Sequence, residues 1–281
     1  MQFAVISPSD AALARPPLQR TEGAARIAFR NDCGVTRLDR LFQQGALKIR
    51  LPRVPAGDPP TAVLINTAGG LTGGDRVSVE MTAGAGCRVI VTGQACEKIY
   101  RARDGEARVH AEIKVADGAR IDWIPQETIL FDGARLARRL DVALAPDATL
   151  LIAEAIVFGR TARGEEVRHG LLTDSWRIRR GEKLVFADEI RFDWQDAGLL
   201  GRPAVLAGGR AIATILFVAP EAERHLEKLR AIVGPAGGAS AWDGKLLARF
   251  VAADGAALRQ VLVPAITLLL EGATLPKTWG L

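Results

Sequence analysis

The sequence predicts a mainly β protein, and two features carry this prediction. Segments that alternate between apolar and polar residues occur along most of the chain, which is the pattern of strands with one buried and one exposed face. Short turns containing glycine separate these segments roughly every 10 to 15 residues, a spacing typical of a sandwich, a barrel or a β-helical stack. No sequence repeat of fixed length is present, so the sequence does not predict a regular solenoid.

The predicted strands share the period-two pattern or are short apolar runs rich in β-branched residues. They lie at residues 25–29, 46–51, 61–66, 76–81, 87–92, 108–115 and 120–124, and strands and turns continue to about residue 218. The turns between them are chemically apt: Asp117-Gly118 and Arg180-Gly181 supply the positive φ that tight hairpins need.

The last 60 or so residues change to a helical pattern. Residues 220–233 predict a helix, with Pro220 in its first turn and Gly234 after its end. A strand at 246–251 and a second helix at 254–270 follow, and Pro264 is expected to kink or shorten that helix.

The domain boundaries follow from composition. Residues 1–20 contain three prolines and many alanines without steady periodicity, so we expect a flexible N-terminal extension. Because no Pro/Ser-rich linker interrupts the rest, residues 21–281 are predicted to form a single β domain with C-terminal helical elements.

Composition restricts the classes of function. The net charge of +5 comes from basic residues scattered among acidic ones, so nucleic-acid binding is not expected. The longest apolar run, around residues 261–270, is too short to span a bilayer. Cys33, Cys87 and Cys96 form neither an even set nor a CxxC pair. We therefore expect a cytoplasmic protein with neither membrane nor nucleic acid as a partner.

Candidate catalytic and metal-binding residues are sparse. His110, His169 and His225 lack the spacings of a metal site, so no stable metal is expected. No nucleophile lies near a base, which predicts that the chain has no catalytic residues and is not an enzyme. Two alternatives stay open: a β-sandwich hydrolase that uses Glu127 and Asp132 as paired carboxylates, and an RNA-binding β protein that uses the arginines.

Five segments stand out from the strand-and-turn background. Residues 66–75 (NTAGGLTGGD) form a glycine-rich loop, but no Lys-Ser/Thr follows it and the next segment is a strand, so neither nucleotide-binding pattern fits. The others are residues 94–101 (QACEKIYR), 125–134 (PQETILFDGA), 158–165 (FGRTARGE) and 275–279 (LPKTW).

These five segments, in this order, resemble the UreD (UreH) family of urease accessory proteins over residues 23–281. Lys277 departs from the family, which usually has arginine there. The resemblance implies two stacked β-helix-like sheets with two C-terminal helices. It also implies a chaperone or scaffold for nickel insertion into apo-urease, acting in a complex with UreF and the GTPase UreG. On this basis no cofactor is bound permanently, and a nickel ion passes transiently through the interior.

Four carboxylates near these segments are candidates for a nickel path: Asp75, Glu97, Glu154 and Asp188. Carboxylate oxygens attract a divalent cation but hold it less tightly than thiolate or imidazole does. A conduit needs such weak successive sites, because the ion must be able to leave each one. We further expect UreF to bind a face that includes part of residues 220–270.

Overall fold

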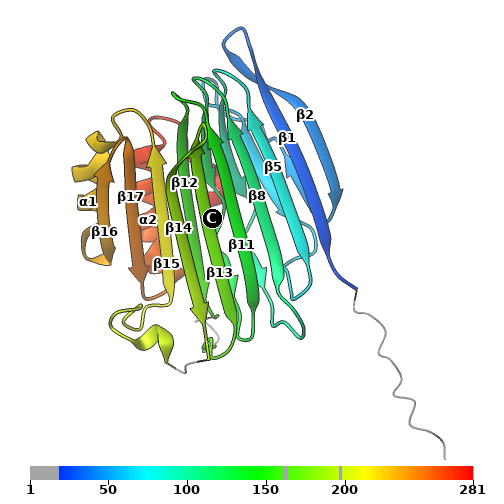
Figure 1. The fold of residues 1–281 in the computed structure, drawn as a ribbon, viewed down its shortest axis with the longest axis vertical. Coiled ribbons are helices and arrows are strands. Elements are labelled where there is room, and N and C mark those ends of the chain that lie inside the picture. Colours follow the sequence, from blue (N-terminus) through cyan, green and yellow to red (C-terminus); the bar gives the residue numbers. More distant parts are fainter. Residues whose placement is uncertain (1–18, 161–163, 196–197, 281) are drawn as a thin grey trace, which may run out of the picture.

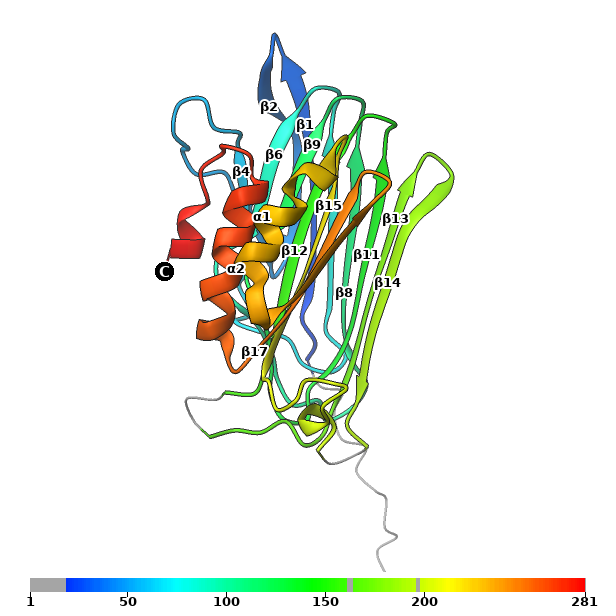
Figure 2. The ribbon, with the colours of Figure 1, turned by 90° about the vertical axis from the view of Figure 1, so that its left-hand side faces the viewer.

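The fold is two face-to-face β-sheets with a layer of helix on the outside of one of them (Figures 1 and 2). The computed structural model describes residues 19–160, 164–195 and 198–280. The predicted mainly β architecture, with stacked sheets and two helices near the C-terminus, is confirmed. The predicted flexible extension, residues 1–20, lies outside the described residues except for Gln19 and Arg20.

The first sheet has seven strands in the order β14-β13-β11-β8-β5-β1-β2. Its inner strands pair in parallel, and the pairs at its two edges, β1–β2 and β13–β14, are antiparallel. The strands are β1 (Glu22–Asp32), β2 (Val35–Gly45), β5 (Arg76–Ala83), β8 (Ala107–Val115), β11 (Arg135–Leu144), β13 (Leu171–Arg180) and β14 (Lys183–Asp193).

The second sheet has ten strands, eight of them in the order β16-β17-β15-β12-β9-β6-β4-β3. Two short strands, β7 and β10, pair with each other, and β10 also pairs with β12. The strands are β3 (Leu47–Arg50), β4 (Thr61–Asn66), β6 (Arg88–Gly93), β7 (Glu97–Ile99), β9 (Arg120–Ile124), β10 (Thr128–Leu130), β12 (Thr149–Phe158), β15 (Ala211–Val218), β16 (Gly237–Trp242) and β17 (Lys245–Ala252).

The centre of the molecule is a stack of rungs in which the chain alternates between the two sheets. Neighbouring rungs place similar positions side by side: Asn66 contacts Glu97, Cys96 contacts Glu127 and Trp123 contacts Glu154, each pair separated by 31 residues. The structure is therefore solenoid-like, although the sequence did not predict a regular solenoid. The offset between paired strands is not constant, since Arg76 pairs with Arg108 but Ala107 with Leu136. This irregular offset explains why no fixed sequence period is visible.

The C-terminal helices cover the outer face of the ten-stranded sheet (Figure 2). They are α1 (Leu226–Val233) and α2 (Gly255–Leu269), and short 3-10 turns occupy Leu199–Gly201, Ala222–His225, Gly234–Ala236 and Lys277–Gly280. The first helix begins later than predicted, because Glu221 adopts a left-handed φ of 56° and the next residues form a 3-10 turn. The second agrees closely with its prediction, and it continues through Pro264.

The strands that the sequence analysis missed include the two edge strands β2 and β16. Strand β2 is exposed along nearly all its length, so its residues show no alternation between a buried and a wet face. Strand β16 begins with two glycines and is also an edge strand. Both lack the one-sided burial that produces a period of two.

Two apolar cores hold the two sheets and the helices together. One lies between the sheets and contains Ile27, Met81, Ile113 and Ile178, all at most 2% exposed. The other packs α1 and α2 against the ten-stranded sheet. Burial at roughly 25 cal/mol per Å² of apolar surface makes these cores the main source of stability.

Candidate functional site

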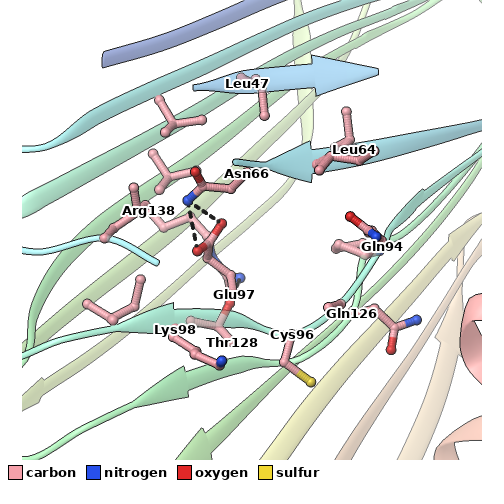
Figure 3. Close-up of a pocket in the computed structure, with 18 of the residues that line it drawn as sticks. Leu47, Leu64, Asn66, Gln94, Cys96, Glu97, Lys98, Gln126, Thr128 and Arg138 are labelled. Carbon is pink, nitrogen blue, oxygen red and sulfur yellow. Dashed lines mark hydrogen bonds between the residues drawn. The ribbon is translucent and has the colours of Figure 1, made fainter. Parts of the chain in front are cut away.

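A cavity of 480 Å³ lies between the two sheets. Strands β5, β8 and β11 line it from the seven-stranded sheet, and β3, β4, β7, β9, β10 and β12 from the ten-stranded one. Its wall is mostly apolar, with Leu64, Val77 and Leu136 among its lining residues. A smaller set of polar side chains shares this wall, as Figure 3 shows. Such a mixture is typical of a site that admits a small polar species into a dry interior.

Glu97 is one of the two predicted carboxylates that line this cavity. Its side chain accepts hydrogen bonds from Asn66 Nδ2 at 3.1 and 3.2 Å, and Figure 3 shows the two residues facing each other. Burial raises the pKa of Glu97, and the hydrogen bond from Asn66 only partly offsets this effect. No cation in the described part of the chain is within ion-pair distance of its carboxylate.

Glu154 is the second predicted carboxylate in the cavity wall, and it belongs to a buried ionic cluster. Trp123 Nε1 donates to Glu154 Oε1 at 2.8 Å, and Arg138 Nη2 lies 2.9 Å from Glu154 Oε2. The guanidinium of Arg138 donates two hydrogen bonds to Asp174, at 3.0 and 2.6 Å, and a third to Thr128 Oγ1, at 3.3 Å. Glu154 Oε2 therefore has Arg138 as its ion-pair partner, and Glu154 and Asp174 share this one cation.

The charges of this cluster do not balance. Arg138 is one cation against two carboxylates, Glu154 and Asp174. Burial raises the pKa of Glu154, and the positive charge of Arg138 does not fully compensate for it. For Arg138 burial alone would lower the pKa, but the two carboxylates outweigh it and raise the pKa. The cluster thus has an excess of negative charge when both carboxyls are ionised.

Asp75 and Asp188, the other two predicted carboxylates, are outside the lining of this cavity. Asp75 is buried and accepts hydrogen bonds from the backbone amides of Thr21 and Thr72, both at 2.8 Å, which holds the glycine-rich loop against the start of the first strand. Asp188 accepts from Arg249 Nη2 at 2.6 Å and so connects β14 to β17 of the other sheet. Each therefore has a local structural partner, and the structure brings together only Glu97 and Glu154.

Glu127 and Asp132, the carboxylates of the hydrolase alternative, belong to separate networks. Glu127 is buried and paired with Arg259, and Cys96 Sγ donates to it at 3.3 Å. Asp132 pairs with Arg101 at 2.7 Å and accepts from two backbone amides. For both groups burial would raise the pKa, but their partners outweigh it and lower the pKa. Neither carboxyl is thus suited to hold a proton as a general acid at neutral pH.

The distinctive sequence segments meet as neighbouring turns of the rung stack. Leu71 N donates to Lys98 O and Tyr100 N to Leu71 O, both at 2.7 Å, so the glycine-rich loop packs on the segment at 94–101. Phe131 N donates to Ile99 O, and the Tyr100 and Phe131 rings meet edge to face at 5.1 Å. A side chain at Gly70, where φ is 147°, would collide with the Tyr100 ring at 2.4 Å. Position 70 thus requires glycine, because the Tyr100 ring lies too close to it for any side chain.

Sequence reasoning missed Arg138 and Asp174, although a signal for both was present. In β11 the inward positions are Leu136, Arg138 and Leu140, and in β13 Asp174 is between Leu172 and Trp176 in the same way. A charged residue at an apolar position of an alternating strand must be paired inside the protein. Two such residues on adjacent strands indicate a buried ion pair.

Two kinds of feature are absent from the described residues. Across residues 19–160, 164–195 and 198–280, no three His, Cys, Asp or Glu side chains come together in a way that could hold a metal ion. In the same ranges no helix is both long enough and apolar enough to cross a membrane.

Comparison with known proteins covers nearly the whole chain. Residues 21–280 match the family described as UreD urease accessory protein. The chain is 52% identical over 272 residues to a urease accessory protein UreD of Rhizobium leguminosarum bv. viciae, covering 96% of this chain and 98% of the relative. It is 50% identical to that of Agrobacterium fabrum, covering 94% and 92%, and 46% identical to that of Brucella suis, covering 94% and 95%.

The fold and the cavity define a two-sheet β scaffold with helices on one face and a carboxylate-bearing interior. The sequence comparisons identify this scaffold more narrowly. The chain belongs to the UreD family of urease accessory proteins.

Proposed function

We propose that this chain is a cytoplasmic, non-catalytic scaffold that helps to load nickel into apo-urease, acting in a complex with UreF and the GTPase UreG. Nickel is its cargo and passes through transiently, without a resident metal or cofactor. Membership of the UreD family supports the link to urease, since the similar proteins are named urease accessory proteins. The observation that carries the nickel role is the presence of Glu97 and Glu154 in one cavity between the sheets.

The chemistry of the cavity suits a divalent cation in transit. Glu97 has an amide rather than a cation as its partner, and Glu154 shares its one cation, Arg138, with Asp174. These oxygens can replace part of the ion's hydration shell. The thiol in the wall, Cys96, donates to Glu127, and burial raises its pKa to about 11, so it is not a thiolate that would trap the ion at neutral pH. Asp75 and Asp188 remain part of the proposal as sites on the route outside the cavity.

The hydrolase alternative has less support, because the carboxylates of Glu127 and Asp132 are each paired with an arginine in separate networks. If the chain is non-catalytic, the purified protein turns over no glycoside. A reproducible turnover that Glu127→Gln abolishes would establish the hydrolase instead.

The first test measures nickel per urease in a strain that lacks this chain. We expect the urease polypeptide to be present but nickel-poor, and re-expression of the chain should restore the metal. Because protein and metal are measured separately, a failure of urease synthesis is distinguishable from a failure of loading. A full complement of nickel in the deletion strain would refute the proposed function.

The second test compares variants of the predicted path. We expect Glu97→Gln and Glu154→Gln to lower urease activation while leaving assembly with the partners intact, because each removes one negative charge with little change in shape. Asp75→Asn and Asp188→Asn test the two positions outside the cavity. Glu112→Gln, a half-buried glutamate on β8 that pairs with Lys114, is the matched control. Normal activation by all four folded and assembled variants would eliminate the carboxylate path but not the scaffold role.

A further inference from the structure

A groove of 540 Å³ lies at the open edge of the molecule, away from the interior cavity. The β13–β14 turn forms one wall, and the end of β15 with the β16–β17 turn forms the other, so the groove lies between the two sheets. Figure 2 shows both of these turns at the same end of the molecule. Its lining includes Arg180, Lys183, Leu184, Trp242 and Lys245. None of the distinctive sequence segments contributes to it.

The groove has an excess of positive charge. Lys245 is almost buried, with a side chain 8% exposed, and within the described ranges its nearest carboxylate is that of Asp243, at 3.9 Å. Asp243 itself is 88% exposed, so solvent weakens this pairing. The guanidinium of Arg180 donates to the carbonyl oxygens of Pro146 and Ala148, which leaves its charge uncompensated by an acid. Lys183 is exposed and makes no ion pair with any described residue.

Exposed apolar side chains adjoin these cations. Leu184 is 42% and Trp242 38% exposed, and they belong to the few large apolar residues of the described chain that are open to solvent. The Trp242 ring is held by Phe186, at 6.5 Å between ring centroids, and by the ammonium group of Lys245, 5.6 Å from its centroid. A fixed, partly exposed tryptophan beside cations is the composition of a protein-binding hot spot.

The backbone around the groove favours a polypeptide over a small anion. Strands β14 and β16 are the terminal strands of their sheets, so each has an edge without a strand partner among the described elements. Such an edge offers backbone donors and acceptors to an added segment. The groove therefore combines backbone contacts, an apolar anchor and three positive charges.

We propose that this groove binds an acidic segment of a protein partner, with an apolar side chain of that segment packed against Trp242 and its carboxylates beside Lys183, Lys245 and Arg180. The choice of partner rests on the proposed function: the lining residues Pro220 and Trp242–Lys245 fall within the region, residues 220–270, that we propose for UreF. The groove adds a particular site and a chemistry to that region.

The experiment uses the full-length chain immobilised on a biosensor, with purified UreF and purified apo-urease as separate probes. Lys183→Glu is expected to weaken the binding of UreF at least tenfold, mainly through a slower association that is most evident at low salt. Trp242→Ala is expected to weaken the same probe about tenfold through faster dissociation. Lys245 is left unaltered, because its burial makes a folding defect the simplest consequence of replacing it.

The matched controls are Arg135→Glu, an exposed cation on β11, and Phe42→Ala, an exposed aromatic on β2. Both should bind as the parent chain does. Unchanged binding of UreF in Lys183→Glu and Trp242→Ala would overturn the proposal, even if the binding of apo-urease fell. Normal nickel loading by the same variants would then show that the proposed function survives. If these two variants lose self-association but still bind the probes, the groove is a contact between copies of this chain. If they lose only RNA binding, the groove is a nucleic-acid site. Either result overturns the proposal.

Discussion

Arg138 shows how strongly one residue can depend on its surroundings. It occupies an inward position of β11 between two leucines, where only an ion pair makes a charge tolerable. Asp174 and Glu154 supply that pair from β13 and β12, strands of different sheets. A single guanidinium thus joins the two sheets beside the cavity and determines the charge of its wall.

At this scale we predict that Arg138→Met destabilises the fold by about 3–5 kcal/mol, because it leaves two buried carboxylates without their cation. The free energy of unfolding, measured by urea titration, checks this. Arg135→Met on the same strand is the control, since Arg135 is exposed, and it should change stability by less than about 0.5 kcal/mol. Equal stability of the two variants would show that the ion pair contributes little.

Helix α2 is anchored at both of its ends. Asp254 caps its start by accepting a hydrogen bond from the Ala257 amide at 2.8 Å. At the other end Arg120 donates to Leu269 O at 2.6 Å, and Arg88 donates to Leu270 O. Side chains of the ten-stranded sheet thus satisfy carbonyls that a helix C-terminus leaves unpaired.

Glu271, just beyond this helix, completes the anchor by pairing with Arg120, Arg224 and His225. Burial would raise its pKa, but the hydrogen bonds from Arg224 and His225 and the charge and hydrogen bond of Arg120 outweigh burial and lower the pKa from 4.5 to about 2. A carboxylate whose pKa is lower in the folded state stabilises the fold above its unfolded pKa. That stabilisation is lost as the pH falls towards the folded pKa.

We therefore predict that the stability difference between the parent chain and Glu271→Gln shrinks as the pH falls from 4.5 to about 2. Urea titrations of both proteins at several pH values measure it. The stability difference between the two proteins is measured, and not the stability of the parent chain alone, because Asp122 has the opposite pH dependence. Burial raises the pKa of Asp122 from 3.8 to about 6, so its contribution to stability is lost as the pH rises from 3.8 to about 6. A difference that does not vary with pH would contradict the role assigned to Glu271.

The whole molecule presents two unlike faces. Helices α1 and α2 cover the outer side of the ten-stranded sheet, whereas the outer side of the seven-stranded sheet has no helix among the described residues (Figure 2). The face of α2 that is buried contains Leu258, Leu262 and Ile266, so core packing accounts for much of its apolar character. Any partner of this region must contact the exposed positions of the helices or the strand edge beside them.

At this scale we predict that UreF binds a face formed in part by residues 220–270. Pull-down with Lys228→Glu and Arg230→Glu, both exposed on α1, should recover less UreF than the parent chain does. Arg26→Glu on the opposite sheet is the control. Unchanged recovery with well-folded α1 variants would move the interface away from this helix.

Much of the fold was predictable because it depends on local patterns. Alternation in residues 76–81 and 108–115 identified β5 and β8, and Asp254 with the apolar spacing after it identified α2. The late start of α1 was not predictable, since the left-handed conformation of Glu221 leaves no mark in the apolar pattern. The edge strands β2 and β16 were missed because they are not buried on one side.

The class of fold, the helices after the strands and the segments that resemble the UreD family could be predicted from the sequence, because each depends on residues close together in the chain. Which carboxylates meet became visible only in the folded structure. Glu97 and Glu154 share a cavity through rung stacking, whereas Asp75 and Asp188 have partners elsewhere. The groove between Lys183 and Trp242 likewise arises from turns far apart in sequence. Pairing between distant strands depends on backbone register and packing, which periodicity along one segment does not encode.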